Sequence, residues 1–478
     1  MTGAENQRYC VCSTCRRTTP AGKQYCQYCW TRLSAYSTIS AAEAVEVEKR
    51  WARREKLKKL WRRVGIPAVS LIIVGSITLT MLYKYTDIFD PLVTSVTSNS
   101  AAGQWSMIRG DLARTGAAGS NATLPRGQVL WTFKAGAPIQ GSPAVVGGTV
   151  YIGSEDHHLY ALDAATGSQK WAFEAGSFVD SSPVVANGIV YVGSNDGFFY
   201  AIDANTGKKL WSFKTFFAVL SSAAVADGIV YFGADDYYIY ALDAKTGHKI
   251  WSFRTGSQVR GSPVVSNGIV YVGSDDANLY ALGAKDGMFR LHFKAGLEAF
   301  SPAVVDSTVY FSSFDGYLFA IDGKARNWPF EYDIKPIWLQ MWAMHIAPKP
   351  PGLSGLLWGM WLGSVVNSAP AVSHNTLYVG VDNNLDAVDL SSRAVLWSFK
   401  TGDDVFSSPA AAGDTVYIGS NDGKIYAVDT ATGSERWHLQ TGDKISGSPT
   451  LVDAPSMSAP ATASCTLSDS QQLSAFSE

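Results

Sequence analysis

Neither sign of charge dominates this sequence, and most of it lacks cysteine. The 478 residues include 39 lysines and arginines against 41 aspartates and glutamates. Such a balance gives no general attraction to nucleic acid, so no nucleic-acid partner is expected. Five of the six cysteines lie between Cys10 and Cys29, and the sixth is Cys465. This distribution excludes a disulfide framework for the long stretch between them.

Charge is also missing from residues 64–83. An apolar run of this length crosses the ~30 Å hydrocarbon core of a bilayer as one helix. Nine lysines and arginines precede it within 48–63, whereas Lys84, Asp87 and Asp90 follow it. The positive-inside rule predicts a single-pass anchor with a cytoplasmic N-terminus, a linker over 84–103 and an extracytoplasmic remainder. The alternative, a cleaved signal peptide, is disfavoured by the long leader before the apolar run.

Residues 36–63 are predicted to form a charged juxtamembrane helix. Its basic half is expected to rest on anionic lipid headgroups, each cation contributing ~1 kcal/mol near the surface. The plainer alternative is an ordinary solvated helix that serves only to set the topology.

Four of the clustered cysteines form two C-x-x-C pairs, ten residues apart: Cys12 with Cys15, and Cys26 with Cys29. Two such pairs can place four thiolates around one Zn²⁺, and the reducing cytoplasm keeps the thiols free. We therefore predict a zinc-ribbon over residues 1–35 that holds structural Zn²⁺ and docks a cytoplasmic protein. Four protein ligands leave no open position for catalysis. Unligated thiols in a disordered tail are the alternative.

This segment resembles the small zinc-ribbon at the N-terminus of many prokaryotic membrane proteins, with one departure. That family usually has glycine after the second cysteine of each pair, whereas this chain has Arg16 and Trp30. Cys10 is a fifth thiol that can replace Cys12 or remain free.

A repeat of nearly constant period runs through the rest of the chain. Each copy begins at a proline-type position, continues with strands such as IVYVGS and LYALDA, and ends after a Thr-Gly turn with a strand such as KLWSFKTG. Four short strands per copy, with Gly, Asn and Asp at the turns, are typical of a β-propeller blade. The proline-type positions are Pro143, Pro183, Ala223, Pro263, Pro302, Pro370, Pro409 and Pro449.

Eight such starts predict an all-β fold with an eight-bladed β-propeller. The first tryptophan strand, 129–136, precedes every start, and the last start, 447–453, has no tryptophan strand after it. Joined, the two would form one blade from both ends of the chain and close the ring, which removes exposed sheet edges. The fourth strands carry Trp131, Trp171, Trp211, Trp251, Trp397 and Trp437, with Leu291 and Phe330 in two weaker copies.

The repeated polar residues have structural roles. Asp203 and Gly207 belong to the turn between the third and fourth strands, where glycine is free to take positive φ. Residues 195–197 form the turn between the second and third strands. Trp211 is expected to wedge between neighbouring sheets, with the small Gly193 giving it room.

The pattern A-x-D-x-x-T-G-x-x-x-W, at 161–171, 201–211 and 241–251, closely resembles the tryptophan-docking repeat of pyrroloquinoline-quinone (PQQ) dehydrogenases and of BamB-like outer-membrane assembly lipoproteins. The resemblance covers residues 104–453. In the dehydrogenases it implies a flat quinone held between a tryptophan and a vicinal disulfide, with Ca²⁺ and a catalytic aspartate beneath. This chain has no adjacent cysteine pair and no acidic cluster outside the repeat turns. PQQ is therefore not expected, and the protein is predicted not to be an enzyme.

Binding is expected where the copies differ from one another. Three residues before each proline-type position the chain reaches the mouth of the central channel, and these residues vary while the scaffold positions do not. They are Gln140, Asp180, Leu220, Arg260, Ala299, Asn367, Phe406 and Ser446. Asp180 and Arg260 can meet a polar ligand, or each other, and ordinary surface variation is the plainer interpretation.

One interval is 68 residues long and carries an apolar insertion over 336–363. Because the insertion is taken to follow an outer strand, it is expected on the same face as the varying residues. Three interpretations compete: a lid over the channel, a loop that dips into the membrane, or a protein-docking surface. Its crowded residues are Trp338, Met341, Trp342, Met344, Trp358, Met360 and Trp361.

Residues 454–478 depart from the repeat. One consistent codon choice, read one frame over, turns 454–468 into AVYVGASDGKLYAL, a normal continuation of the repeat. The tail is therefore predicted to be a frameshift that does not fold natively, and the nucleotide sequence tests this.

Taken together, the sequence predicts a non-catalytic, membrane-anchored propeller that binds envelope proteins as a scaffold, as BamB-like proteins do, or senses a ligand. The alternative is an enzyme resembling the PQQ-dependent dehydrogenases.

Overall fold

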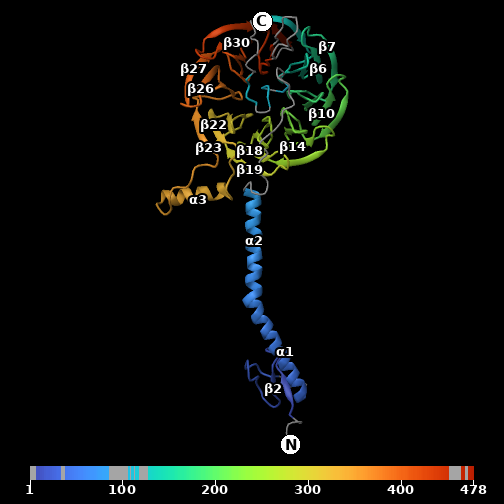
Figure 1. The fold of residues 1–478 in the computed structure, drawn as a ribbon, viewed down its shortest axis with the longest axis vertical. Coiled ribbons are helices and arrows are strands. Elements are labelled where there is room, and N and C mark those ends of the chain that lie inside the picture. Colours follow the sequence, from blue (N-terminus) through green and yellow to red (C-terminus); the bar gives the residue numbers. More distant parts are fainter. Residues whose placement is uncertain are drawn as a thin grey trace. The chain divides into compact units, whose positions relative to one another are not determined.

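The computed structural model describes residues 7–33, 38–85, 106–107, 109–111, 114–117, 127–451, 464–468 and 472–477 (Figure 1). They divide into two compact units, Met1–Tyr83 and Lys84–Glu478. Beyond Tyr85, the predicted linker 84–103 lies outside the described residues, as does most of the tail after Leu451.

The N-terminal unit combines a β-hairpin with a long helical stretch. The hairpin pairs β1 (Tyr9–Val11) with β2 (Thr18–Pro20). The helical elements follow one another directly: α1 (Ala41–Leu60), the π-helical turn η1 (Trp61–Gly65) and α2 (Ile66–Tyr85). Among the described residues, the stretch Ala41–Leu82 contains the one helix that is long and apolar enough to cross a membrane.

Helix α1 begins at a capping box and is tied to the hairpin by one carboxylate. Ser40 accepts a hydrogen bond from the Glu43 amide, and the Glu43 side chain accepts one from the Ser40 amide. One turn further, Glu48 accepts hydrogen bonds from the Thr18 amide at 2.8 Å and from Arg17 Nε at 3.2 Å. The helix and the hairpin therefore form one module.

The C-terminal unit is a ring of antiparallel sheets (Figure 1). Seven of them have four strands, and strands of each blade follow one another along the chain from the inside of the ring outward. The blades are β4 (Ala144–Val146), β5 (Thr149–Gly153), β6 (His158–Asp163) and β7 (Gln169–Glu174); β8 (Val184–Ala186), β9 (Ile189–Gly193), β10 (Phe198–Asp203) and β11 (Lys209–Lys214); β12 (Ala224–Ala226), β13 (Ile229–Gly233), β14 (Tyr238–Asp243) and β15 (Lys249–Arg254); β16 (Val264–Ser266), β17 (Ile269–Ser274), β18 (Asn278–Gly283) and β19 (Phe289–Lys294); β20 (Ala303–Val305), β21 (Thr308–Ser312), β22 (Tyr317–Asp322) and β23 (Leu356–Trp361); β24 (Ala371–Ser373), β25 (Thr376–Val381), β26 (Asn384–Asp389) and β27 (Ala394–Lys400); and β28 (Ala410–Ala412), β29 (Thr415–Gly419), β30 (Lys424–Asp429) and β31 (Glu435–Gln440).

The prediction of eight blades is wrong, because the described residues form seven. The remaining sheet has three strands, β3 (Gln128–Lys134), β33 (Gln472–Ser477) and β32 (Ser464–Ser468). In the last start only Thr450 takes part in a β-bridge, so no inner strand forms there. The physical reason lies in the sequence after Leu451, where APSMSAPATAS replaces the strand-forming VYIGS-type segment of the other copies. The frameshift itself stays a prediction.

A belt of hydrogen bonds joins neighbouring copies at the inner edge of the ring. In most copies a backbone amide donates to a serine hydroxyl of the next copy. The Ser182 amide, for example, donates to the Ser222 hydroxyl at 2.9 Å. The belt also joins the last copy to the first, because the Ser448 amide donates to the Ser142 hydroxyl at 2.9 Å. This contact keeps the inner edge continuous although the terminal sheet lacks a fourth strand.

Docked tryptophans join the outer parts of the blades. The indole of Trp211 donates to the Ala244 carbonyl of the next blade at 3.2 Å. A Cβ on Gly247 would lie 2.7 Å from that indole ring, so glycine is required at this turn. Gly247, and not Gly193 as expected, gives Trp211 its room; a Cβ on Gly193 would instead meet Val219.

The ring has two faces, which we name by their connections. The loops between blades meet the turns between second and third strands on the loop face, where the Asn195 amide donates to the Phe178 carbonyl at 2.9 Å. The remaining turns meet on the opposite turn face, where the Ala204 amide donates to the Gly188 carbonyl at 2.9 Å. Antiparallel strands place these two sets of connections at opposite ends of each blade.

Candidate functional site

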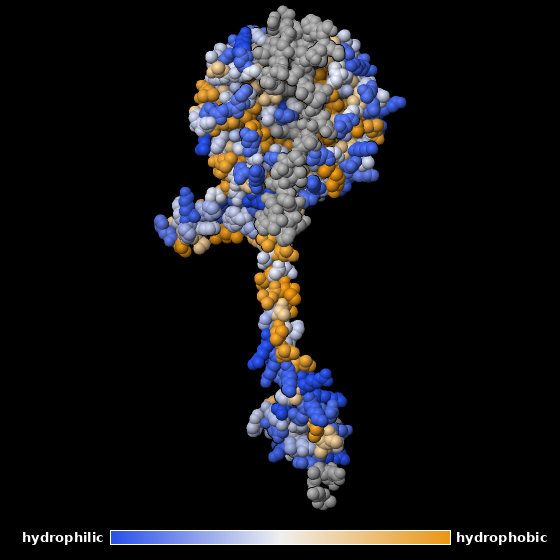
Figure 2. Space-filling view, in the orientation of Figure 1, coloured by the Kyte–Doolittle hydropathy of each residue, from blue (hydrophilic) through white to orange (hydrophobic). Residues whose placement is uncertain are grey.

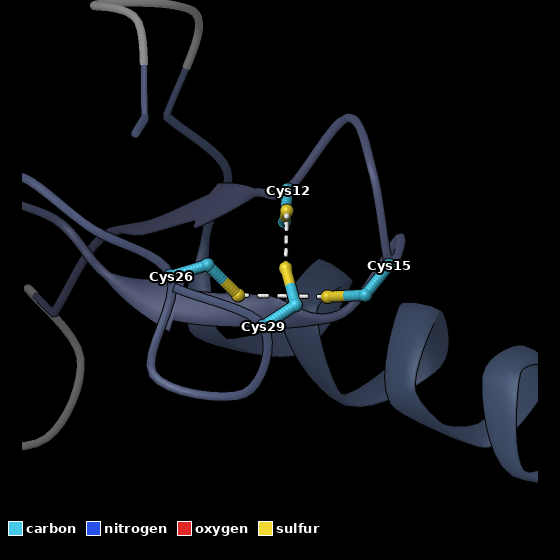
Figure 3. Close-up of side chains that lie close together, drawn as sticks. All are labelled: Cys12, Cys15, Cys26 and Cys29. Carbon is cyan, nitrogen blue, oxygen red and sulfur yellow. Dashed lines mark hydrogen bonds between the residues drawn. The ribbon is translucent and has the colours of Figure 1, made fainter. Parts of the chain in front are cut away.

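The four cysteines of the two pairs come together at the end of the hairpin (Figure 3). Their sulfur atoms all lie within 4.8 Å of one another, with Cys12 to Cys29 and Cys15 to Cys26 both at 3.5 Å. Four metal–sulfur bonds of ~2.3 Å in a tetrahedron require sulfur separations of ~3.8 Å, which fits this spacing. The cluster can therefore hold a metal ion. Cys10, which pairs with Thr19 in the hairpin, is not one of the four.

Both cysteine pairs adopt the same turn, which explains the departure from glycine. The Arg16 amide donates to the Cys12 carbonyl at 2.9 Å, and the Trp30 amide donates to the Cys26 carbonyl at 3.0 Å. Arg16 and Trp30 have φ of 56° and 57°, the left-handed region that glycine adopts without strain. Non-glycine residues are thus held in a backbone conformation that glycine, expected at these positions, would adopt without strain.

The surroundings of the thiols favour the deprotonated form at one edge of the cluster. Hydrogen bonds from Thr31 lower the pKa of Cys29 to about 6. Desolvation by burial raises the pKa of Cys15 to about 12. Metal binding must therefore displace a proton from Cys15, which makes the affinity of the cluster depend on pH.

A short segment of the chain lies in the centre of the ring, and a cavity of about 530 Å³ remains beside its residues Thr115 and Ala117. The described residues of this segment are 106–107, 109–111 and 114–117. Three of its carbonyls accept hydrogen bonds from the innermost strands of three different blades, so the segment lies in the central channel. These bonds run from the amide of Val185 to Ser106 (2.8 Å), of Val372 to Thr115 (2.7 Å) and of Ala411 to Gly116 (2.7 Å).

Two arginines of this channel segment, Arg109 and Arg114, have 2% and 0% of their surface exposed. Each guanidinium donates to carbonyls at the start of two inner strands. Arg109 donates to Ser301 (3.3 Å), Pro302 (3.1 Å) and Pro370, and Arg114 donates to Pro263 (2.9 Å), Ser222 (3.0 Å) and Ala223 (2.9 Å). The two side chains therefore bridge four blades from inside the ring.

Removal from water lowers the pKa of both guanidinium groups to about 9, which leaves them charged at neutral pH. A buried charge is tolerated when hydrogen bonds replace its water, and the inner-strand carbonyls do this for two of the three nitrogens of each guanidinium; Arg109 Nε and Arg114 Nη1 are buried without a hydrogen-bond partner among the described residues. Our sequence interpretation missed both residues. The signal was present in the sequence RGDLARTG, where two arginines stand in a segment with few other large side chains.

The predicted residues at the channel mouth lie on the loop face and bind their immediate neighbours. Asn195 donates to Asp180 at 2.7 Å, and Gln140 donates to Glu155 at 3.1 Å. Arg260 forms an ion pair with Asp235 at 3.2 Å and lies 3.7 Å from Asp275. The Asn367 amide donates to the Gly380 carbonyl at 3.4 Å. Asp180 and Arg260 therefore each have a partner close by, and the structure does not bring them together.

Aromatic side chains that the sequence interpretation did not select are exposed on the loop face. Phe216 and Phe217 stand where the other copies have glycine and, in most of them, a polar residue, and 86% and 64% of their surface is exposed. Phe178 is also exposed, and its carbonyl accepts from the amide of Asn195 in the adjacent turn. A Cβ on Gly197 of that turn would lie 3.0 Å from the Phe217 carbonyl. Phe178 and Phe217 thus flank one turn, and we call Phe178, Phe216 and Phe217 the phenylalanine patch.

The insertion lies elsewhere than expected. The predicted range 336–363 covers most of α3 (Glu331–Ala343) and the fourth strand β23 itself. The connection between β22 and β23, which carries α3, leaves the ring on the turn face and not on the loop face. Trp338 and Trp342 lie on α3, whereas Trp358 and Trp361 belong to strand β23. Trp358 pairs with Ala320 as the docked tryptophans pair in other blades, so it fills the position that was assigned to Phe330.

Ring, docked tryptophans and repeat together define a β-propeller protein of the PQQ-like repeat class. The family described as outer membrane protein assembly factor BamB matches residues 120–233, 218–328 and 335–458, and the chain belongs to this family. Among curated proteins, none matches the chain.

Several solved structures share the fold at low identity. A europium-containing methanol dehydrogenase is 16% identical, with a TM-score of 0.61 over 77% of this chain and 90% of that one. The quinohemoprotein alcohol dehydrogenase of Comamonas testosteroni is 16% identical, with a TM-score of 0.61 over 80% and 81%. BamB from Moraxella catarrhalis is 16% identical, with a TM-score of 0.56 over 73% and 96%. Two enzymes and one BamB protein are thus similar to this chain in fold.

Proposed function

We propose that the protein is a non-catalytic binding protein of the cell membrane. Helix α2 anchors it, the N-terminal module holds structural Zn²⁺ in the cytoplasm, and the extracytoplasmic propeller binds envelope proteins as a BamB-like scaffold. A ligand sensor that signals through the cytoplasmic module is the second form of the same proposal.

The segment inside the channel is the observation that carries the non-catalytic part. Arg109 and Arg114 take up the carbonyls of the inner strands, and the segment that holds them lies where a ring-bound cofactor would need space. The residues present do not fit PQQ as the dehydrogenases are expected to hold it, because the sequence has no vicinal cysteine pair. The dehydrogenase-like alternative is supported only by similarity of fold.

The choice of zinc rests on the donor set. Four cysteine sulfurs with tetrahedral spacing suit Zn²⁺ or an iron–sulfur centre, and a short two-pair ribbon is typical of structural zinc. Metal analysis of the full-length protein should give one Zn²⁺ per chain. Cys12→Ser should abolish zinc binding, and Cys10→Ser should leave it unchanged. Loss of zinc in both variants would reject the assignment of the four ligands.

The phenylalanine patch supports protein binding on the loop face. Three phenylalanines around one turn expose apolar surface that a folded partner can cover, and aromatic residues are enriched at interface centres. A photo-crosslinking residue in place of Phe216 in growing cells should give covalent adducts with envelope proteins, identified by mass spectrometry. The same residue in place of Leu210, half-exposed on outer strand β11, is the control. Equal adducts at both positions, or none at Phe216, would reject the patch as the binding surface.

A further inference from the structure

Helix α3 projects from the propeller with an apolar surface that the ring does not cover. We propose that residues 336–347 insert into the lipid surface of the membrane in which α2 anchors the chain, so that α3 fixes the turn face of the propeller on the bilayer. The inference rests on the proposed anchoring by α2.

The base of α3 is built to be rigid. The Glu331 carboxylate is fully buried and pairs with Lys335 at 3.2 Å. It also accepts hydrogen bonds from the Ser354 amide at 2.9 Å and from Asn327 Nδ2 at 2.9 Å. Lys335 donates to the Gly352 carbonyl at 2.6 Å, which ties the start of the helix to the returning chain. A buried ion pair with all these partners holds one geometry.

The base is also fixed to the neighbouring blade. The ring of Tyr332 stacks on His292 of β19 with centroids 4.3 Å apart, and its hydroxyl donates to the His292 carbonyl at 3.1 Å. The direction in which α3 leaves the ring is therefore set by packing and does not depend on a partner.

Beyond this base, the helix and the loop after it expose apolar side chains. Between Lys335 and Lys349 there is no lysine, arginine, aspartate or glutamate. Every residue from 339 to 346 is exposed. Figure 2 shows orange, apolar residues along the lower side of the arm that contains α3, beside paler and hydrophilic residues on its upper side. The largest exposed fractions are those of Ile337 (60%), Met344 (60%) and Ile346 (66%), beside Ile334, Leu339, Met341 and Trp342.

The distribution of these side chains favours lipid over a protein groove. A helix that binds a groove carries one apolar stripe, with polar residues on its other side. On α3 the apolar side chains spread over most of the circumference, and Gln340 is the only uncharged polar side chain among residues 336–343 apart from the indoles. Tryptophans such as Trp338 and Trp342 are enriched at the level of the lipid headgroups.

The channel segment and α3 lie toward one face of the ring. Ser106, Thr115 and Gly116 bond at the middle of inner strands, whereas Arg109 and Arg114 reach carbonyls nearer the loop face. Ala117 forms a parallel bridge with Ala411 of β28, so this end of the segment runs toward the turn face, from which α3 also leaves. Twenty residues, 86–105, separate Tyr85 at the end of α2 from Ser106.

The test compares three labelled positions in the full-length protein, loaded with Zn²⁺ and reconstituted in phosphatidylcholine–phosphatidylglycerol vesicles. Cys10→Ser and Cys465→Ser remove the thiols outside the cluster. A single NBD fluorophore is then attached at Met344→Cys on α3, at Val74→Cys on α2, or at Phe216→Cys on the loop face. All three residues are exposed in the structure, so the substitutions leave the core intact. Quenching by doxyl-labelled lipid is measured for each.

We expect doxyl lipid to quench the label at Met344 at least half as strongly as the label at Val74, and to leave the label at Phe216 unquenched. Quenching at Val74 without quenching at Met344 would overturn the inference while leaving the anchor intact, and would assign α3 to a protein partner. No quenching at Val74 would overturn the proposed anchoring and the inference with it. Equal quenching at Met344 and Phe216 would show non-specific adsorption and would also overturn the inference.

Discussion

At the scale of single residues, Trp30 shows a conflict between its side chain and its backbone. Its φ of 57° costs a non-glycine residue ~1–2 kcal/mol, and 79% of its surface is exposed, so it contributes little packing in return. Replacing Trp30 with glycine would relieve this strain, but part of the stability gained would be lost because glycine gives the unfolded chain more conformational entropy. We expect Trp30→Gly to stabilise the metal-bound module by about 0.5–1 kcal/mol, which is about a two- to fivefold gain in Zn²⁺ affinity by chelator competition.

Trp30→Ala is the matched control, because alanine removes the indole but keeps the strain of positive φ. An equal gain in both variants would mean that the indole, and not the backbone, destabilises the module.

Asp275 gives a pH dependence with a defined sign. Burial, followed by repulsion from Glu298, raises the pKa of Asp275 from its ordinary 3.8 to about 6, against the attraction of Arg260. Between about pH 4 and 6 the folded state therefore binds a proton that the unfolded state has released, so this group stabilises the fold less as pH rises through the window. Asp275→Asn should remove that contribution.

The difference in unfolding free energy between Asp275→Asn and wild type should accordingly move in favour of the variant from pH 4 to pH 7. Urea titrations at both pH values measure it. Arg260 keeps Asp235 as partner at 3.2 Å in the variant. A difference that is constant with pH would contradict the raised pKa.

The cysteine ligands were predictable because two C-x-x-C pairs bring their sulfurs together through local turns. The tryptophans and turn aspartates were predictable for a similar reason, since repeated copies reveal their shared role. Arg109 and Arg114 were not, because their partners lie more than a hundred residues away and occur once each. No repeat and no local spacing indicates such a contact.

At the scale of elements, the channel segment acts as an internal brace. Arg114→Met should destabilise the propeller by about 3 kcal/mol, because the carbonyls of Pro263, Ser222 and Ala223 would lose a charged donor inside the ring. Arg114→Lys should recover only part of this, since a single ammonium cannot reproduce the planar fork. Denaturation by urea, followed by tryptophan fluorescence, measures both.

Arg254→Met is the matched control, because Arg254 is exposed at the end of outer strand β15. A similar loss of stability in both variants would mean that the buried contacts of Arg114 contribute little.

The position of the insertion shows a limit of pattern matching at this scale. Counting residues from the preceding copy placed the outer strand at Phe330, whereas α3 and its loop delay that strand to β23. The insertion was therefore assigned to the wrong connection and to the wrong face. The signal for the true fourth strand was Trp358, which lies in a strand whose residues alternate between more and less exposed. Assuming a fixed repeat period led us to overlook it.

At the scale of the whole molecule, the all-β propeller followed from the repeat, but the number of blades did not. A count of starts gives eight, yet a blade requires four strands, and the copy that begins at Pro449 is followed by a segment with few strand-forming residues. The terminal strand β3 pairs instead with β33 of the tail. The number of starts in the sequence gives the number of repeat copies. A copy forms a blade only where four strands find hydrogen-bonded neighbours.

The central proposal is that a segment of the protein's own chain occupies the channel of this propeller in place of PQQ. Equilibrium dialysis of the full-length protein in detergent against PQQ and Ca²⁺, with PQQ read by absorbance, tests it most directly. We predict no calcium-dependent retention of PQQ and no oxidation of alcohols. Retention of one PQQ per chain together with dye-linked alcohol oxidation would contradict the account.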